Sequence, residues 1–286
     1  MSVLALAVVA CGSDSDDAGD TETLPEPPAT ELPPTTEAPP DTAAPVDTED
    51  ADVVLEYGTY GGFTTPAFSF QMQPDVYVSS DGRVFGPGPA PAIYPGALVP
   101  AMSVRTITQD GIDSLLAAAE DAGMLAEVDY EADTMIADAG TATLRIRTDG
   151  EEFLHEAYAL GIGGPPGTDG ELTPERDALA DFIDQLFDLE TLVGASELGD
   201  PEPFDPTGYQ FVAQPIADPS VYGAEPTVVD WPADTGVRLA ESLECVEIER
   251  AAVGDLFESA NELTFFVEDD LIYGLAVRPV LPGRTC

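Results

Sequence analysis

The chain has 286 residues and a formal net charge of −46 at pH 7, with 55 acidic residues against nine basic ones, all of them arginine. Such a charge repels the phosphate backbone of nucleic acids and anionic lipid head groups, which argues against nucleic-acid binding. Hydrophobic residues make up 44% of the chain, enough for a packed core. The acidic surface suits either solubility in a salty environment or a cationic partner, and we expect the former.

The first residues place a cysteine directly behind a short apolar run. Residues 3–10 are aliphatic, and residues 8–11 (Val-Val-Ala-Cys) resemble a bacterial lipobox. The resemblance implies that a diacylglyceryl group joins the Cys11 sulfur and that a signal segment, residues 1–10, is then removed. Eight apolar residues are too few to span a bilayer, which takes roughly twenty. Because no basic residue precedes Arg83, we expect a truncated or misassigned start; the alternative is an unmodified Cys11 in an apolar tail.

Residues 11–52 are predicted to be a disordered, lipid-anchored linker. The stretch is rich in acid, proline and threonine and poor in large apolar residues, so it cannot bury enough surface to fold. Proline pairs and like charges hold such a chain extended. About forty residues at about 3.1 Å each would hold the following body on the order of 100 Å from a membrane.

The first part of the body, residues 53–193, is predicted to be an α+β domain. The dipeptides Asp81-Gly82 and Asp149-Gly150 each separate two apolar-alternating runs, and Asp-Gly favours a two-residue hairpin turn with positive φ at both positions. The strand signals of this part lie at residues 53–57, after 66–70, and at 76–80, 83–85, 104–108, 142–148 and 151–160.

Two helices are predicted in the same part from apolar residues spaced three and four apart. The first covers residues 109–123 and ends at Gly123. The second begins at Thr173 with Pro174 in its first helical position, and its apolar stripe is Leu179, Phe182, Ile183 and Leu186. Residues 194–206, rich in glycine, proline and acid, are expected to mark a boundary.

Residues 205–286 are predicted to be a smaller β-α-β-β domain or subdomain. Its elements are a strand near 245–248, a helix around 253–260, and strands at 263–267 and 271–277. The two halves together indicate an α+β fold with mostly antiparallel sheets and about three helices. The ending, residues 276–282 before a terminal cysteine, resembles uncharacterised secreted lipoproteins of high-GC Gram-positive bacteria. That resemblance transfers no site residues.

The cysteines indicate a disulfide. If Cys11 carries lipid, Cys245 and Cys286 remain as an even pair outside the cytosol, where disulfides form and persist. Such a bond would also fix the C-terminus, which would otherwise fray. The alternative is two unpaired buried thiols.

His155 is the only histidine and is therefore the first candidate for catalysis. The Asp-Gly turn sets it opposite Leu144, on the apolar face of its hairpin, so we expect a core residue rather than a catalytic base. Glu156 points the opposite way, and Arg147 and Glu152 share that other face, where they can pair. No catalytic residue is predicted.

No motif predicts a nucleophile, a phosphate loop or a metal centre. The segment around Ser196 has one residue too many for a nucleophile elbow, and the glycine-rich residues 161–166 hold prolines where a helix should begin. One histidine without a local cysteine cluster does not fit zinc. Calcium binding at the acidic residues 14–17 or 269–270 stays open, with turn formation expected at the latter. No cofactor is expected.

Two aromatic residues are candidate contacts for a ligand or partner. Tyr94 lies in the glycine- and proline-rich residues 86–100, which we expect to be an ordered loop, and Trp231 is the only tryptophan. Exposed, both would be natural anchors; core packing is the alternative.

The function predicted from these features is that of an exported, lipid-anchored surface protein on the extracytoplasmic face of the cell membrane. Its role would be binding or structural rather than catalytic. Its partners would be membrane lipid through Cys11 and an envelope protein or cationic partner. The alternative is an exported hydrolase that uses acidic residues.

Overall fold

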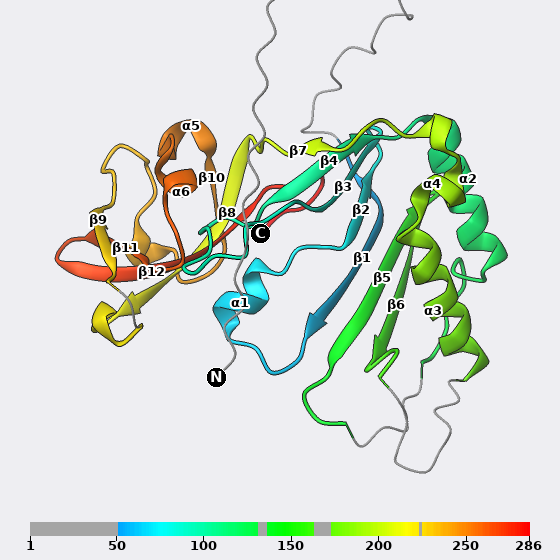
Figure 1. Cartoon of the computed structure of the whole chain (residues 1–286), viewed down its shortest axis with the longest axis horizontal. Helices are drawn as coiled ribbons and strands as arrows, with labels where there is room; N and C mark the ends of the chain where they lie inside the picture. The colour runs from blue at the N-terminus through cyan, green and yellow to red at the C-terminus, as the bar shows by residue number, and fades with distance from the viewer. Residues whose placement is uncertain (1–50, 131–135, 163–172, 223–224) are drawn as a thin grey trace, which may run out of the picture. The chain divides into compact units, whose positions relative to one another are not determined.

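The computed structural model describes residues 51–130, 136–162, 173–222 and 225–286 (Figure 1). The signal segment, Cys11, the acidic residues 14–17 and nearly all of the linker lie outside the described residues. The described part of the chain forms two β-sheets whose strands pair antiparallel with one exception, which confirms the predicted mostly antiparallel character. It contains six α-helices instead of the expected three, but four of them have six residues or fewer.

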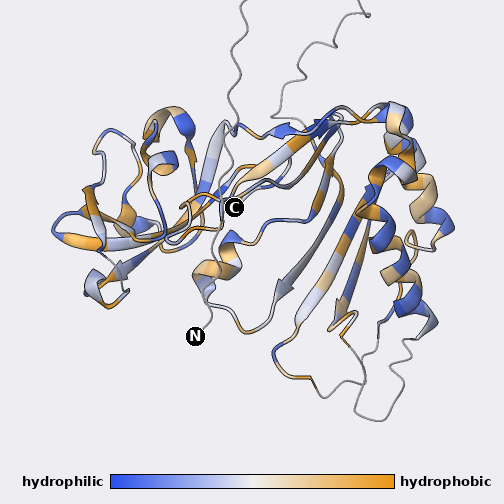
Figure 2. Ribbon diagram, viewed as in Figure 1, coloured by the Kyte–Doolittle hydropathy of each residue, from blue (hydrophilic) through white to orange (hydrophobic). Residues whose placement is uncertain are grey.

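The first sheet has seven strands in the order β6-β5-β1-β2-β3-β4-β7, and every neighbouring pair is antiparallel. Its strands are β1 (Val53–Gly61), β2 (Val76–Ser79), β3 (Arg83–Pro87), β4 (Met102–Thr106), β5 (Gly140–Thr148), β6 (Glu151–Tyr158) and β7 (Glu202–Pro203). Hydrophilic and hydrophobic residues alternate along β5 (Figure 2), as expected for a strand with one buried and one open face.

The two hairpin turns of this sheet differ from each other. In the β5–β6 hairpin, Asp149 and Gly150 both have positive φ, and the predicted register with Leu144 opposite His155 is confirmed. In the β2–β3 hairpin, the pair opposite each other is Ser79 and Arg83, so three residues form the turn and only Gly82 has positive φ. The prediction of a two-residue turn there is wrong, because a turn closed by a single left-handed glycine takes three residues.

Three helices cover one face of the first sheet, and their caps explain where two of them begin. The helices are α2 (Gln109–Asp121), α3 (Pro174–Leu186) and α4 (Leu189–Val193). The side chains of Thr108 and Thr173 accept hydrogen bonds from the backbone amides of Gly111 and Arg176, the third residues of α2 and α3, which satisfies donors that the helix leaves free. The apolar stripe predicted for α3 is buried against Leu55, Leu144 and Ile146 of the sheet, among others.

One predicted segment has a different structure. Residues 66–70 do not lead into a strand; they form the helix α1 (Pro66–Gln71), capped by Thr65 with Pro66 in the first turn. Residues 194–206 run along the edge of the first sheet, where Gly199 donates a backbone hydrogen bond to Thr106 and β7 pairs with β4.

The second sheet has five strands in the order β10-β8-β12-β11-β9. Its strands are β8 (Gly208–Ile216), β9 (Thr227–Asp230), β10 (Val246–Glu249), β11 (Thr264–Glu268) and β12 (Leu271–Pro279). The predicted strands β10, β11 and β12 are confirmed, whereas β8 and β9 were not predicted. The single helix expected between β10 and β11 is two, α5 (Arg250–Val253) and α6 (Leu256–Ser259), separated at Gly254 with positive φ.

Both sheets belong to one compact unit. The second sheet has its own core, whose larger members are Tyr209, Phe211, Trp231, Phe257, Phe266 and Tyr273. Within the described ranges, no helix has both the length and the apolar character needed to cross a membrane.

His155 lies in the core of the first sheet, as predicted, with a fully buried side chain. Its Nε2 lies 2.8 Å from the carbonyl oxygen of Met124, which can only accept, so Nε2 carries the proton. Its Nδ1 then accepts from the Tyr130 hydroxyl at 2.8 Å. Burial lowers the pKa of His155, so the ring is neutral in the folded protein.

We expect His155→Gln to lower the free energy of unfolding by about 1–3 kcal/mol, because the Tyr130 hydroxyl and the carbonyl oxygen of Met124 lose a buried hydrogen-bond partner of the right shape. The pH dependence follows from the lowered pKa. The unfolded chain takes up a proton near pH 6.5 and the folded one only at lower pH, so His155 contributes full stability above pH 6.5 and less as the pH falls. Urea unfolding at pH 7.5 and 5.5 measures this; a stability gap between the two proteins that does not narrow towards pH 5.5 would contradict it.

Candidate functional site

The C-terminal tail, residues 280–286, leaves the second sheet and lies on the open face of the first sheet. Leu281 is buried there in a small apolar cluster with Val53, Tyr77, Phe85 and Met102. The Tyr77 hydroxyl donates a hydrogen bond to the carbonyl oxygen of Pro282. This face is opposite the helices, because Tyr77 alternates with Val76 and Val78, which belong to the helix-covered core.

A glycine allows the tail to approach the first strand closely. Gly283 has a φ of +69°, and a Cβ atom there would lie 2.8 Å from the carbonyl oxygen of Ala51. Neither the conformation nor the space suits another residue. The tail therefore turns at Gly283 directly against the start of β1.

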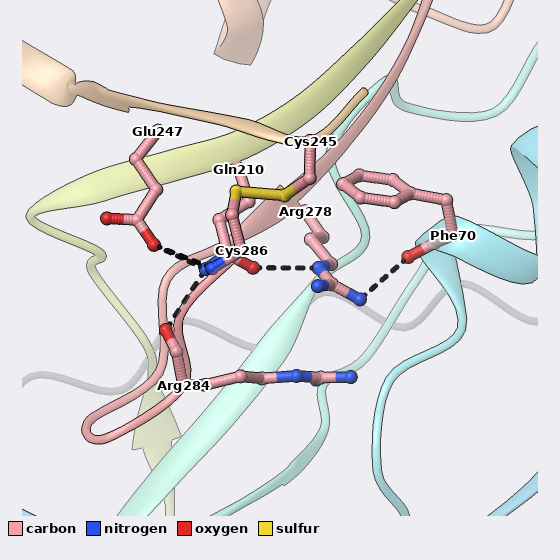
Figure 3. Close-up of a disulfide and its surroundings, with 7 residues drawn as sticks. All are labelled: Phe70, Gln210, Cys245, Glu247, Arg278, Arg284 and Cys286. Carbon is pink, nitrogen blue, oxygen red and sulfur yellow. Dashed lines mark hydrogen bonds between the residues drawn. A yellow bond between two sulfur atoms is a disulfide. The ribbon is translucent and has the colours of Figure 1, made fainter. Parts of the chain in front are cut away.

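The predicted disulfide between Cys245 and Cys286 is present and holds the end of the tail, with the two Cα atoms 5.4 Å apart. Two hydrogen bonds reinforce it (Figure 3): Gln210 Nε2 donates to the carbonyl oxygen of Arg284 at 3.0 Å, and the backbone amide of Cys286 donates to Glu247 Oε1 at 3.2 Å. Arg284 thus lies between a fixed end and the close approach at Gly283.

A pocket of about 500 Å³ lies between the tail and the open face of the first sheet. The sheet contributes three residues of β1, three alternate residues of β5, one residue of β6 and Tyr77 of β2, and the tail contributes residues 283–285. The lining residues are Val53, Glu56, Tyr60, Tyr77, Thr143, Arg145, Arg147, Glu156, Gly283, Arg284 and Thr285. Three of the nine arginines of this acidic chain therefore line one pocket.

Two of these arginines have carboxylate partners. Arg145 Nη1 lies 3.2 Å from Glu56 Oε2, and Arg147 Nε lies 2.6 Å from Glu152 Oε2, the pair predicted from the hairpin register. Glu56 also accepts a hydrogen bond from the Tyr60 hydroxyl at 3.1 Å. Burial, and then the charge of Glu56, raise the pKa of Tyr60, so its hydroxyl stays protonated.

Arg284 forms only a long ion pair. Among the described residues its guanidinium forms no hydrogen bond, and its nearest carboxylate oxygen, Glu56 Oε1, is 4.0 Å away. Its side chain is only 17% exposed. In Figure 3 the side chain extends away from the disulfide, and no dashed line reaches its guanidinium.

A further arginine lies close by. Arg278 stacks on the ring of Phe70 at 4.3 Å and donates from Nε to Gln210 Oε1 at 3.0 Å (Figure 3). Burial, and then the positive charge of Arg284, lower the pKa of Arg278 to about 10. The two guanidinium groups therefore repel each other, although the charges of Glu56 and Glu247 partly compensate.

The two aromatic candidates lie in different environments. Tyr94 is 66% exposed in the loop that follows β3, and its peptide bond to Pro95 is cis. Trp231 is 6% exposed, and its indole Nε1 donates to the carbonyl oxygen of Val237 at 2.8 Å. Trp231 is therefore a core residue and not an exposed anchor, because its ring packs against Phe211 and Phe266 of the second sheet and Phe257 of α6.

The acidic pair 269–270 forms the β11–β12 turn, with positive φ at both residues, and Asp269 pairs with Arg238. Across the described ranges, no group of three or more His, Cys, Asp or Glu side chains is arranged to hold a metal ion. Ser196 donates to Glu197 at 2.9 Å and lies apart from His155, which is enclosed in the core.

A second hollow, of about 350 Å³, has a different chemistry. Residues 97–102 and 203–206 line it together with Tyr209, Arg250 and Glu258 of the second sheet and its helices. Its charges satisfy one another: Arg250 pairs with Asp205 and lies 2.6 Å from Glu258, which also accepts from Tyr209. The pocket beneath the tail is the stronger candidate because, among the described residues, its largely buried Arg284 has only a long ion pair with Glu56 and no hydrogen-bonded carboxylate.

No family model, no curated protein and no solved structure matches this chain. The pocket was not predicted from the sequence. One signal for it exists, since Arg145 and Arg147 alternate on one strand of a chain that otherwise has few basic residues. The contribution of Arg284 depends on where the disulfide places the tail.

Proposed function

We propose that this is an exported, lipid-anchored protein of the cell envelope whose body has a binding or structural role without catalysis. The observation that carries the proposal is the disulfide between Cys245 and Cys286, because such bonds persist outside the cytosol and are rare within it. The lipobox-like residues before Cys11 supply the anchor. The acidic, proline-rich linker supplies the spacing from the membrane.

The pocket beneath the tail supports a binding role. Ligand sites are concave and carry a few converging polar groups, and this pocket brings arginine and tyrosine side chains together on a rigid sheet. Of the two carboxylates that line the pocket, Glu56 and Glu156, the first already interacts with Arg145 and Tyr60, so the two do not form a free pair of acids for hydrolysis. The acidic surface elsewhere suits an envelope protein or another partner that is cationic.

The anchor is tested by replacing Cys11. In cells fed a fatty-acid analogue that can be coupled to a dye, we expect the full-length precursor to be labelled and Cys11→Ser to lose nearly all label, because the thiol that accepts the lipid is gone. Gel fluorescence of the membrane fraction measures this. Cys286→Ser is the matched control and should label like the parent. Equal labelling of Cys11→Ser would refute the anchor.

A further inference from the structure

We propose that the pocket beneath the C-terminal tail binds a small oxyanion, a carboxylate or phosphate group, with Arg284 as its main charged contact. The inference rests on the proposed binding function and gives it a ligand class. It follows from the donors that the pocket leaves unpaired, from the concentration of positive charge there and from the size of the space.

The first argument is the missing acceptor for Arg284. A guanidinium carries five N–H donors, and a largely buried cation is normally paired. Within the described part of the chain, three buried side-chain polar atoms have no hydrogen-bond partner, and two of these are Arg284 Nη1 and Arg145 Nε. Both belong to arginines that line this pocket. An oxyanion in the pocket would supply the acceptor oxygens that Arg284 lacks.

The second argument is the placement of positive charge. The chain has nine arginines among 55 acidic residues, yet Arg145, Arg147 and Arg284 share the pocket and Arg278 lies close enough to repel Arg284. Two carboxylates, Glu56 and Glu156, line the same pocket, so its three arginines leave one positive charge without a lining counter-charge. Gathering like charges costs free energy unless counter-charge is present. The arginine fork matches the two oxygens of a carboxylate or phosphate, which makes these two groups the natural counter-charge.

The third argument concerns the size of the ligand. The pocket of about 500 Å³ accommodates a small molecule. The net charge of −46 repels polyanions and anionic membranes, whereas a small ligand with one or two charges is repelled far less and can reach the arginines. The hydroxyls of Tyr60, Thr143 and Thr285 line the same space and can hydrogen-bond the rest of such a ligand.

The test is calorimetric titration of the full chain, with its disulfide intact, using inorganic phosphate and succinate as probes at constant ionic strength. We expect saturable binding of at least one probe with one site per chain. Arg284→Gln should weaken it by about tenfold or more, because a charge-assisted hydrogen bond is lost. Arg147 lies at the exposed rim of the pocket, so Arg147→Gln should weaken binding by a smaller factor. This variant replaces Arg284→Gln as the test if Arg284→Gln does not fold. Arg238 lies outside the pocket, in the loop between β9 and β10, so Arg238→Gln removes the same charge elsewhere and should bind like the parent.

Each outcome has one meaning. Binding of phosphate alone assigns a phosphate-bearing ligand, and binding of succinate alone assigns a carboxylate. No saturable binding of either probe, or equal affinity in the parent, Arg147→Gln and Arg284→Gln, overturns the inference. Failure here is separable from failure of the proposed function: a chain that is labelled at Cys11 but binds neither probe loses the inference alone, and a chain that binds but is never labelled loses the anchor alone.

Discussion

Replacing Cys245 and Cys286 together by serine is expected to lower the free energy of unfolding by about 4 kcal/mol. The bond joins positions separated by 41 residues, so it removes a large part of the freedom of the unfolded chain. The tail also loses its fixed end, which weakens the burial of Leu281 against the open face of the first sheet. Urea unfolding of the full chain followed by far-UV circular dichroism measures the change.

The control for this variant is Cys11→Ser, which also removes a sulfur but closes no loop in the described structure, and it should unfold like the parent. A double-serine variant that unfolds within about 1 kcal/mol of the parent would contradict the expected result. Such a result would mean that packing and hydrogen bonds hold the tail in place without the disulfide.

Trp231→Ala is expected to cost about 3–5 kcal/mol of unfolding free energy, because truncating a buried indole leaves a large cavity. The ring lies within 6.0 Å, centroid to centroid, of Phe211, Phe257 and Phe266, and its Nε1 donates to the carbonyl oxygen of Val237. Unfolding is followed by circular dichroism instead of tryptophan fluorescence, because the variant lacks the only tryptophan of the chain.

Tyr94→Ala is the matched comparison. Its side chain is two-thirds exposed, so its removal should change the unfolding free energy by no more than about 0.5 kcal/mol. Similar costs for Trp231→Ala and Tyr94→Ala would show that Trp231 is not the core residue described above. Tyr94 stays a candidate partner contact, as the sequence predicts.

The local structure that the sequence predicts well depends on turn and cap residues. The Asp149-Gly150 turn fixes the β5–β6 register, so the faces of His155, Arg147 and Glu152 follow from alternation alone. The apolar stripe and the start of α3 follow from Thr173 and the 3.6-residue period in the same way.

The errors have physical reasons too. The sequence predicts that residues 66–70 lead into a strand, but the Thr65 cap and the fixed φ of Pro66 favour a helical turn. Strand β9 pairs in parallel with β11, which is remote in sequence, and no local turn specifies such a pairing. Strand β8 shows the apolar alternation of a strand, so its signal was present in the sequence.

The pocket could be predicted only in part. Alternation places Arg145 and Arg147 on the open face, but Glu56, Tyr60 and Arg284 join them through sheet order and the path of the tail. The cysteine count predicts the disulfide without showing what it lies against. That Arg284 Nη1 is buried without a hydrogen-bond partner among the described residues is visible only when all its neighbours are in place.

The central claim is that the disulfide holds the tail over the first sheet and thereby completes an anion pocket. The most direct test is to titrate the full chain with the binding probe before and after reduction, under conditions in which the far-UV circular dichroism is unchanged. The account predicts one site per oxidised chain and an affinity at least about tenfold weaker after reduction, because Arg284 is no longer held in place. Equal affinity in the two forms would contradict it.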